Sequence, residues 1–244
     1  MKLNLATWNM DWRGHKQHLK EAWKYFIEEL GCDILLSQES KPSEGLLNAE
    51  GMIWSPIGGT RPWGSGIYSP NYKIEEYPYI QTSRNNFRGS VTVAEVEVTT
   101  DLNLILISLY GLLEKISTVG YSITNLHRIF SDLTGILELG DTKNRVIIGG
   151  DFNASLQIDD LQPGESHRVF FDRLEQFGLV NCFEGYFDDF VQTLRHGRSE
   201  KPWQNDYFFI SKKLESKLVD CRVIDNDSVC KFSDHNPVII SLEI

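Results

Sequence analysis

The segment 146–153 of this chain, Val-Ile-Ile-Gly-Gly-Asp-Phe-Asn, is an apolar run that ends abruptly on polar side chains. Side chains two residues apart in a strand point to the same face. An extended segment would therefore turn Asp151 and Asn153 towards one pocket and Phe152 towards the core. The two preceding glycines allow another backbone or a ligand to approach closely. A carboxylate and an amide are expected together at the edge of a sheet, where a fold can place reactive groups.

A second polar group lies near the end of the chain. Residues 232–242 read Phe-Ser-Asp-His-Asn-Pro-Val-Ile-Ile-Ser-Leu, so Asp234 and His235 come just before an apolar strand. A histidine beside a carboxylate can be held in one tautomer and one protonation state near neutral pH. Either segment taken alone is also compatible with an ordinary turn. The repetition of the pattern along the chain favours chemistry over a turn.

Four more apolar segments begin or end near a side chain that could take part in catalysis or metal binding. Segment 3–9 ends on Asn9, segment 33–39 ends on Glu39, and segment 104–111 ends at Tyr110. In segment 204–210, the apolar run begins just after Asp206. Six predicted strand ends thus carry polar or aromatic groups that a fold could gather at one place.

The segments between these strands indicate helices and a hairpin. Apolar residues recur at helical spacing near residues 15–30 and over 123–137, and each stretch is followed by a glycine, which predicts two helices packed on a sheet. Residues 90–99 alternate in polarity and a second apolar run follows, which predicts a β-hairpin and partly antiparallel sheets. Because the sequence has no repeat, low-complexity tract or linker, we expect one domain over residues 1–244.

The order and context of the six strand ends resemble the endonuclease/exonuclease/phosphatase superfamily over essentially the whole chain. This metal-dependent phosphoesterase superfamily includes abasic-site endonucleases, DNase I-like nucleases, deadenylases, inositol phosphatases and neutral sphingomyelinases. The resemblance implies an α+β fold, in which a two-sheet β-sandwich carries helices on its outside in four α/β/β/α layers. It also implies a site at one rim of the sheets.

Hydrolysis of a phosphodiester requires that charge developing on the phosphoryl oxygens is neutralised and that a water is held in line for attack. Hard oxygen ligands select Mg²⁺ or Mn²⁺ over zinc. We expect Glu39 to be the main metal ligand, with Asn9 helping directly or through water. Asp234 is expected to lie near the metal or behind its ligands.

The resemblance also implies roles for the remaining groups. Asp151 would activate or orient the attacking water, and Asn153 would hydrogen-bond the phosphate or Asp151. His235 would stabilise the transition state as a cation or hydrogen-bond donor, while Asp206 would orient its imidazole and favour its charged form. Tyr110 would donate a hydrogen bond to a phosphate oxygen.

Two loops and one isolated arginine are candidates for substrate contact. Segment 193–203 is locally basic and ends in an aromatic residue, which suits phosphate contacts beside a stacked base. Segment 58–66 is rich in glycine and carries a second arginine and tryptophan. The candidate residues are Arg195, Arg198, Lys201 and Trp203 in the first loop, Arg61 and Trp63 in the second, and Arg88 beside Gly89.

Composition limits the possible partners. The formal net charge of −10 argues against a broad non-specific nucleic-acid surface, so a polyanion would have to be bound at a limited area. The four cysteines show no C-x-x-C pairing, so neither a zinc site nor a disulfide framework is expected. No apolar run reaches membrane-spanning length and the N-terminus lacks the layout of a signal peptide. We therefore expect a cytoplasmic enzyme with no membrane partner.

These observations predict a divalent-metal-dependent hydrolase of phosphodiester bonds, with a nuclease acting on DNA or RNA as the leading function. A phosphatase or phosphodiesterase of a nucleotide or inositol phosphate is the first alternative, and a catalytically silent binding module is the second. Tyr110 is similar to the abasic-endonuclease and deadenylase branches, because DNase I-like and sphingomyelinase branches typically place histidine there. The following Gly111-Leu112-Leu113 differs from the Val-Pro-Asn run of abasic endonucleases, which speaks against abasic-site specificity.

Overall fold

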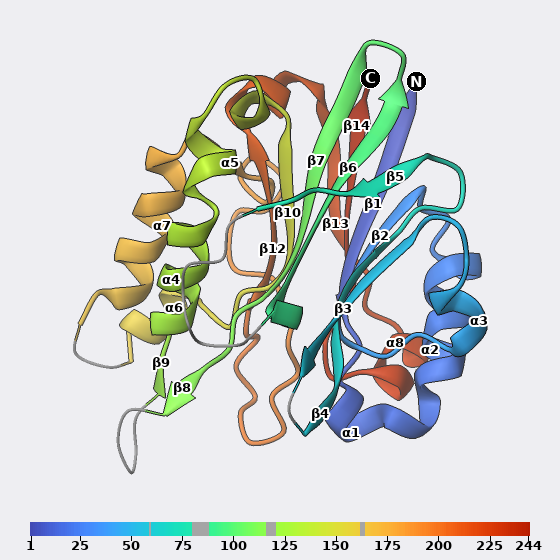
Figure 1. The fold of residues 1–244 in the computed structure, drawn as a ribbon. Coiled ribbons are helices and arrows are strands. Elements are labelled where there is room, and N and C mark those ends of the chain that lie inside the picture. Colours follow the sequence, from blue (N-terminus) through green and yellow to red (C-terminus); the bar gives the residue numbers. More distant parts are fainter. Residues whose placement is uncertain (59, 80–87, 116–120, 162–163) are drawn as a thin grey trace.

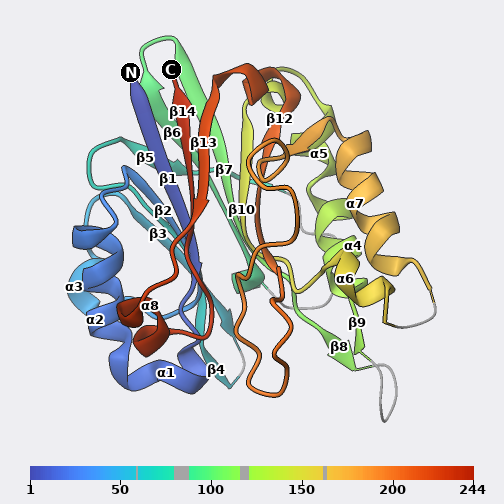
Figure 2. The same ribbon diagram turned by 180° about the vertical axis from the view of Figure 1, so that it is seen from behind.

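The computed structural model describes residues 1–58, 60–79, 88–115, 121–161 and 164–244. The described strands form two six-stranded sheets that face each other, with helices on both outer sides (Figures 1 and 2). The predicted α+β sandwich of four α/β/β/α layers is confirmed.

One sheet, called sheet A, combines strands from both ends of the chain. Its strand order is β13 (Leu218–Val223), β14 (Val238–Glu243), β1 (Lys2–Asn9), β2 (Ile34–Ser40), β4 (Arg61–Tyr68) and β3 (Met52–Gly58). β1 and β2 are parallel, whereas β14 runs antiparallel to β1. The carboxyl ends of β1 and β2 therefore meet the amino end of β14 at one edge.

The other sheet, called sheet B, repeats this geometry. Its strand order is β11 (Leu179–Asn181), β12 (Asp206–Ser211), β10 (Val146–Asp151), β7 (Leu102–Tyr110), β6 (Val91–Thr99) and β5 (Ile74–Glu76). β7 and β10 are parallel with Tyr110 opposite Asp151, and β12 is antiparallel to β10 with Asp206 opposite Asp151. This register sets three predicted site residues side by side. The predicted hairpin is β6–β7.

Side chains that alternate along a strand pack on opposite faces of the sheet, and β1 shows how this forms the layers. On β1, Leu3 and Leu5 join the core that contains sheet B, whereas Ala6 and Trp8 pack with Phe26 under the helices of sheet A. These side chains are fully buried. Burying each large apolar side chain contributes roughly 1.5–3 kcal/mol, so both faces of β1 resist a shift of register.

Helices cover both outer sides of the sandwich (Figures 1 and 2). On sheet A they are α1 (Trp12–His15), α2 (Leu19–Lys24), α3 (Glu44–Leu47) and α8 (Asp227–Phe232), and on sheet B they are α4 (Thr124–Asp132), α5 (Thr134–Glu138), α6 (Leu156–Asp159) and α7 (Ser166–Gln176). Minor elements are a ribbon, β8 (Glu114–Lys115) with β9 (Tyr121–Ser122), a π-helical turn at Tyr25–Glu29, and 3-10 turns at Lys16–His18, Arg88–Ser90, Thr142–Asn144 and Lys212–Lys217. Both predicted helices form, but each is divided into shorter pieces.

The two termini lie side by side at one end of the sandwich (Figure 1), where the Ile244 backbone N donates to the Met1 carbonyl at 2.7 Å. The carboxyl ends of β1 and β2 point to the opposite end. The four cysteines are free, and Cys32, Cys182 and Cys221 are buried. Among the described residues, no helix combines the length and the apolar character needed to cross a membrane.

Candidate active site at the rim of the two sheets

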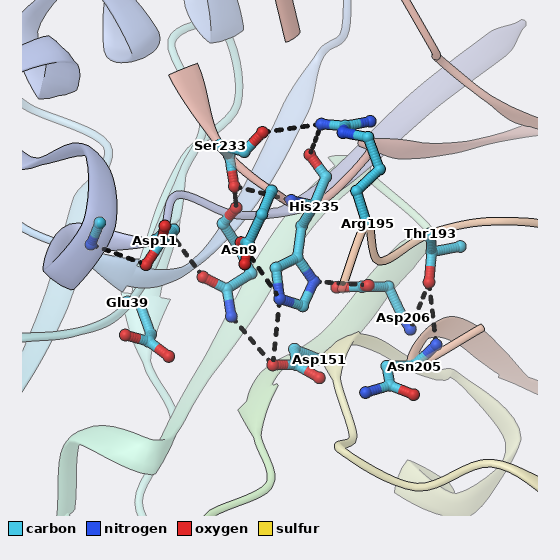
Figure 3. Close-up of polar contacts among 12 residues, drawn as sticks. Asn9, Asp11, Glu39, Asp151, Thr193, Arg195, Asn205, Asp206, Ser233 and His235 are labelled. Carbon is cyan, nitrogen blue, oxygen red and sulfur yellow. Dashed lines mark hydrogen bonds and ion pairs between the residues drawn. The ribbon is translucent and has the colours of Figure 1, made fainter. Parts of the chain in front are cut away.

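Strand ends from both sheets meet at the rim opposite the termini. Asn9 ends β1 and Asp151 ends β10, and Asn9 Nδ2 donates to Asp151 Oδ2 at 2.9 Å (Figure 3). Asn153 donates to the same carboxylate through its backbone N and its Nδ2, both at 2.9 Å. Phe152 between them is fully buried. The structure therefore brings Asp151 and Asn153 together on one side while Phe152 joins the core.

A histidine–carboxylate pair lies beside Asp151. His235 Nδ1 is 2.8 Å from Asp206 Oδ2, and both side chains are almost fully buried (Figure 3). Hydrogen bonding of Nδ1 to a carboxylate fixes Nδ1 as a proton donor. His235 Nε2 then lies 3.9 Å from Asp151 Oδ2 and 3.8 Å from Asp234 Oδ1. The second imidazole nitrogen is thus left for a reacting group near Asp151.

The loop that carries His235 is fastened to the sheet by specific bonds. Ser233 Oγ donates to the Asn9 carbonyl at 2.7 Å and accepts from the His235 backbone N at 3.0 Å. Arg195 Nη2 donates to the Ser233 carbonyl at 2.7 Å, and its Nη1 donates to Asn236 Oδ1. The guanidinium of Arg195 therefore anchors this loop, and the substrate contact that the sequence predicted for it would have to compete with these bonds.

Glu39 of β2 is bound by two side chains at the same rim. Tyr110 OH donates to Glu39 Oε1 at 2.6 Å, while Arg13 Nε and Nη2 donate to Oε2 and Oε1, each at 3.1 Å. Arg13 Nη2 also donates to Tyr110 OH at 3.1 Å. The sequence predicted that Tyr110 would donate to a phosphate oxygen, but its proton is directed to Glu39. In this structure Tyr110 positions the carboxylate.

Three site residues have a strained backbone. Asp11, Glu39 and Asn153 have φ values of 40°, 41° and 48°, and they are the described non-glycine residues with positive φ. Such conformations cost of order 1–3 kcal/mol each and persist only where the surroundings impose them. Hydrogen bonds hold all three side chains. The coincidence of strain with this rim supports a functional role for it.

The surroundings of Asp151 and His235 raise the pKa values of both groups. Burial is the main reason that the pKa of Asp151 rises to about 7, and Asp206 adds to the rise against the opposing effect of His235. Burial by itself lowers the pKa of His235, but the carboxylates of Asp206 and Asp151 outweigh it and raise that pKa well above its usual value. Asp151 can therefore exchange a proton near neutral pH, while its neighbours favour the charged form of His235.

Two donor groups at the rim fit a cation. The carboxylate of Glu39 already binds a cation, the guanidinium of Arg13, and its oxygens are the hard ligands that suit Mg²⁺ or Mn²⁺. Asp151, Asp206 and His235 offer ligand atoms within 4.8 Å of one another and form a second possible metal group. A metal there would have to break the buried bond between His235 Nδ1 and Asp206, whereas at Glu39 it would displace Arg13, whose side chain is 61% exposed, so the surroundings favour the Glu39 position.

Two residues near Glu39 escaped the sequence analysis. Asp11 follows β1, its backbone N donates to Asn9 Oδ1 at 2.9 Å, and its carboxylate lies 2.7 Å from His15 Nδ1. The spacing of Asn9 and Asp11 mirrors that of Asp151 and Asn153, and this signal could have identified Asp11. Nothing in the sequence singled out Arg13, because its role depends on contact with a distant strand.

Asp234 is more exposed than the other predicted metal ligands, Glu39 and Asn9. Its side chain is 42% exposed and faces His235 Nε2. Among the described residues, no hydrogen bond or ion pair joins it to Glu39 or Asn9.

The predicted substrate contacts fall into different surroundings. Lys201 Nζ lies 4.9 Å from the centre of the Trp203 ring, and Arg198 is exposed on the same loop.

Trp63 is only 1% exposed and packs edge-on against Tyr110, so the predicted contact of this ring with substrate does not fit its burial. The exposed Arg61 lies with its guanidinium 5.8 Å from the Trp63 ring. Arg88 begins the turn Arg88–Ser90, and the contact predicted for its side chain lies outside the described residues.

A buried carboxylate with a raised pKa, next to an imidazole and to a carboxylate that could hold a cation, suits the hydrolysis of a phosphate ester. At the rim of a two-sheet sandwich, this chemistry defines a class of phosphoesterases. Residues 6–235 match the model of the Endonuclease/Exonuclease/phosphatase family. The chain belongs to this family of metal-dependent phosphoesterases.

Solved structures share the fold at low sequence identity. An AP endonuclease from Leishmania major is 18% identical with a TM-score of 0.74, covering 100% of this chain and 88% of that one. An AP endonuclease from Archaeoglobus fulgidus is 19% identical with a TM-score of 0.71, covering 99% and 100%. A 3′ phosphatase from Neisseria, bound to a product DNA hairpin, is 17% identical with a TM-score of 0.65, covering 99% and 100%. No curated protein sequence matches this chain.

Proposed function

We propose that this protein is a nuclease that depends on Mg²⁺ or Mn²⁺ and hydrolyses phosphodiester bonds in DNA. The observation that carries the proposal is the position of Asp151. Its carboxylate is held by Asn9 and Asn153 and lies 3.9 Å from His235 Nε2, so a base and an acid converge on one point of the rim.

In the proposed mechanism each residue has a separate role in an in-line displacement at phosphorus. Asp151 accepts a proton from the attacking water, and Asn9 and Asn153 fix the direction of its carboxylate. His235 donates from Nε2 to a phosphoryl oxygen, while Asp206 keeps the imidazole charged and oriented. Glu39 with Asn9 would hold the divalent cation, which supplies positive charge for the phosphoryl oxygens when bound.

Nucleic acid as the substrate is supported by a local feature of the chain and by its relatives. The overall charge is −10, so a polyanion must be bound at a limited basic area. Arg198, Lys201 and Trp203 form such an area on the loop that leads into Asp206. The structural relatives include AP endonucleases and a phosphatase bound to a DNA hairpin.

Hydrolysis of a substrate panel tests the proposal. The panel contains single-stranded and duplex DNA, abasic DNA, RNA, nucleotides and inositol phosphates, each with Mg²⁺, Mn²⁺ or EDTA. We expect cleavage of DNA that EDTA abolishes and that Asp151→Asn lowers by about 10²–10⁴-fold, the usual contribution of a general base. Asp151→Asn keeps the size of the side chain and serves as the control for a contaminating nuclease. Cleavage that survives EDTA or the substitution would contradict the mechanism.

A small phosphate ester is the second candidate substrate. The acidic balance of the chain favours it, because a free nucleotide or inositol phosphate needs fewer basic contacts than a polymer. The same panel separates the two functions. Metal-dependent release of phosphate from small esters, with intact DNA, would replace the nuclease by a phosphatase that uses the same residues.

A further inference from the structure

The metal ligand expected at the rim already has a cationic partner within the chain. Arg13 Nε and Nη2 bind the two oxygens of Glu39 in parallel, each at 3.1 Å. This two-pronged geometry is the strongest form of an arginine–carboxylate pair. Both oxygens of Glu39 are therefore in use, and Oε1 also accepts the Tyr110 proton at 2.6 Å.

The two partners differ in how firmly they are held. The Glu39 side chain is 8% exposed and belongs to a strand in the middle of sheet A, whereas the Arg13 side chain is 61% exposed. Arg13 lies in α1, a single turn with no buried residue. Its other described contacts are the Tyr110 hydroxyl at 3.1 Å and the face of Trp63, whose ring centre is 5.5 Å from the guanidinium carbon. The arginine can leave this site at much lower cost than the glutamate.

We propose that Arg13 is an internal counter-ion that occupies Glu39 until a divalent cation displaces it. This inference rests on the proposed metal-dependent function. Mg²⁺ or Mn²⁺ on either oxygen of Glu39 would lie next to the guanidinium, and like charges at such a distance repel strongly. Arg13 and the metal therefore exclude each other from Glu39. In the absence of metal, Arg13 spares the protein an unpaired buried carboxylate.

The exchange predicts that removing Arg13 tightens metal binding. Titration calorimetry with MnCl₂ and no substrate measures Kd for the wild type and four variants. Arg13→Gln should lower Kd by about 3- to 10-fold, as expected for loss of one competing ion pair. Arg13→Lys keeps the charge without the two-pronged geometry, so its Kd should lie between those of the wild type and Arg13→Gln. Lys16→Gln, which removes the same charge three residues further on, should change Kd by less than about twofold because exposed charges are screened. Glu39→Gln should remove the binding.

The tryptophan under Arg13 provides a second readout. Release of the guanidinium from Trp63 should change the fluorescence of that ring when Mn²⁺ or Mg²⁺ binds. The change should be present in the wild type, absent in Arg13→Gln, and absent in Trp63→Phe, which corrects for the other tryptophans. An unchanged or higher Kd in Arg13→Gln would overturn the exchange, as would an equal decrease in Lys16→Gln. Those results would leave the metal-dependent nuclease intact. Absence of Mn²⁺ binding in the wild type and in Arg13→Gln would overturn both proposals.

Discussion

Replacement of Asp206 by asparagine tests whether this carboxylate keeps His235 charged. The two groups are buried and joined at 2.8 Å, and Asp206 is the main group that raises the pKa of His235. If charged His235 is the form that works, the rate falls as pH rises through the pKa of His235. Asp206→Asn lowers that pKa because it removes the negative charge. The alkaline fall of the pH–rate profile should therefore move to lower pH.

The size of the effect follows from the bond that is weakened. A hydrogen bond to a charged group contributes about 1.5–3 kcal/mol and a neutral one about 1 kcal/mol. Asparagine can still accept from Nδ1, so the expected loss is about 0.5–2 kcal/mol. At 1.36 kcal/mol for each factor of ten, kcat/KM should fall by about 2- to 30-fold on the pH plateau of the wild type.

Profiles of kcat/KM against pH on a chromogenic phosphodiester, at saturating Mg²⁺, measure both effects. Asp234→Asn is the matched control, because Asp234 carries the same charge at 3.8 Å from Nε2 but is 42% exposed. It should move the alkaline fall much less, since solvent screens exposed charges. An alkaline fall that stays in place in Asp206→Asn, or that moves equally in Asp234→Asn, would refute the assigned role of Asp206.

Three further predictions concern the base, the substrate loop and the core. With Asp151 as the base, kcat/KM should rise with pH through about 7, the raised pKa of its buried carboxylate, and a rise centred near pH 4 would contradict that role. Substituting Arg198 and Lys201 together should weaken DNA binding and flatten its salt dependence in fluorescence-anisotropy titrations, and Trp203→Ala should cost roughly 1–3 kcal/mol if a base stacks on the ring. Hydrolysis of the small diester should change little, and a parallel loss of both activities would show that the loop supports catalysis instead. Phe152→Ala should lower the free energy of unfolding, measured in urea, by about 3–5 kcal/mol, because Phe152 is fully buried among other aromatic rings. A loss below about 1 kcal/mol would mean that the core collapses to fill the cavity.

The sequence by itself determined the positions along the chain where chemistry is located. A short-range pattern, an apolar strand that begins or ends on a polar group, marks Asn9, Glu39, Tyr110, Asp151 and Asp206. Alternation also determined that Phe152 faces inward between Asp151 and Asn153. Such features depend only on the period of a strand and on neighbours in the chain, so they can be read without a fold.

Tertiary structure decided which groups share a bond. Arg195 looked free in sequence, yet its guanidinium holds the loop of Ser233 and Asn236. Trp63 looked like a loop aromatic, but it is buried against Tyr110. Arg13 reaches Glu39 because the parallel pairing of β1 and β2 brings the segment after β1 to the end of β2. These contacts join residues tens of positions apart, and their distances and dielectric surroundings exist only once the two sheets have packed.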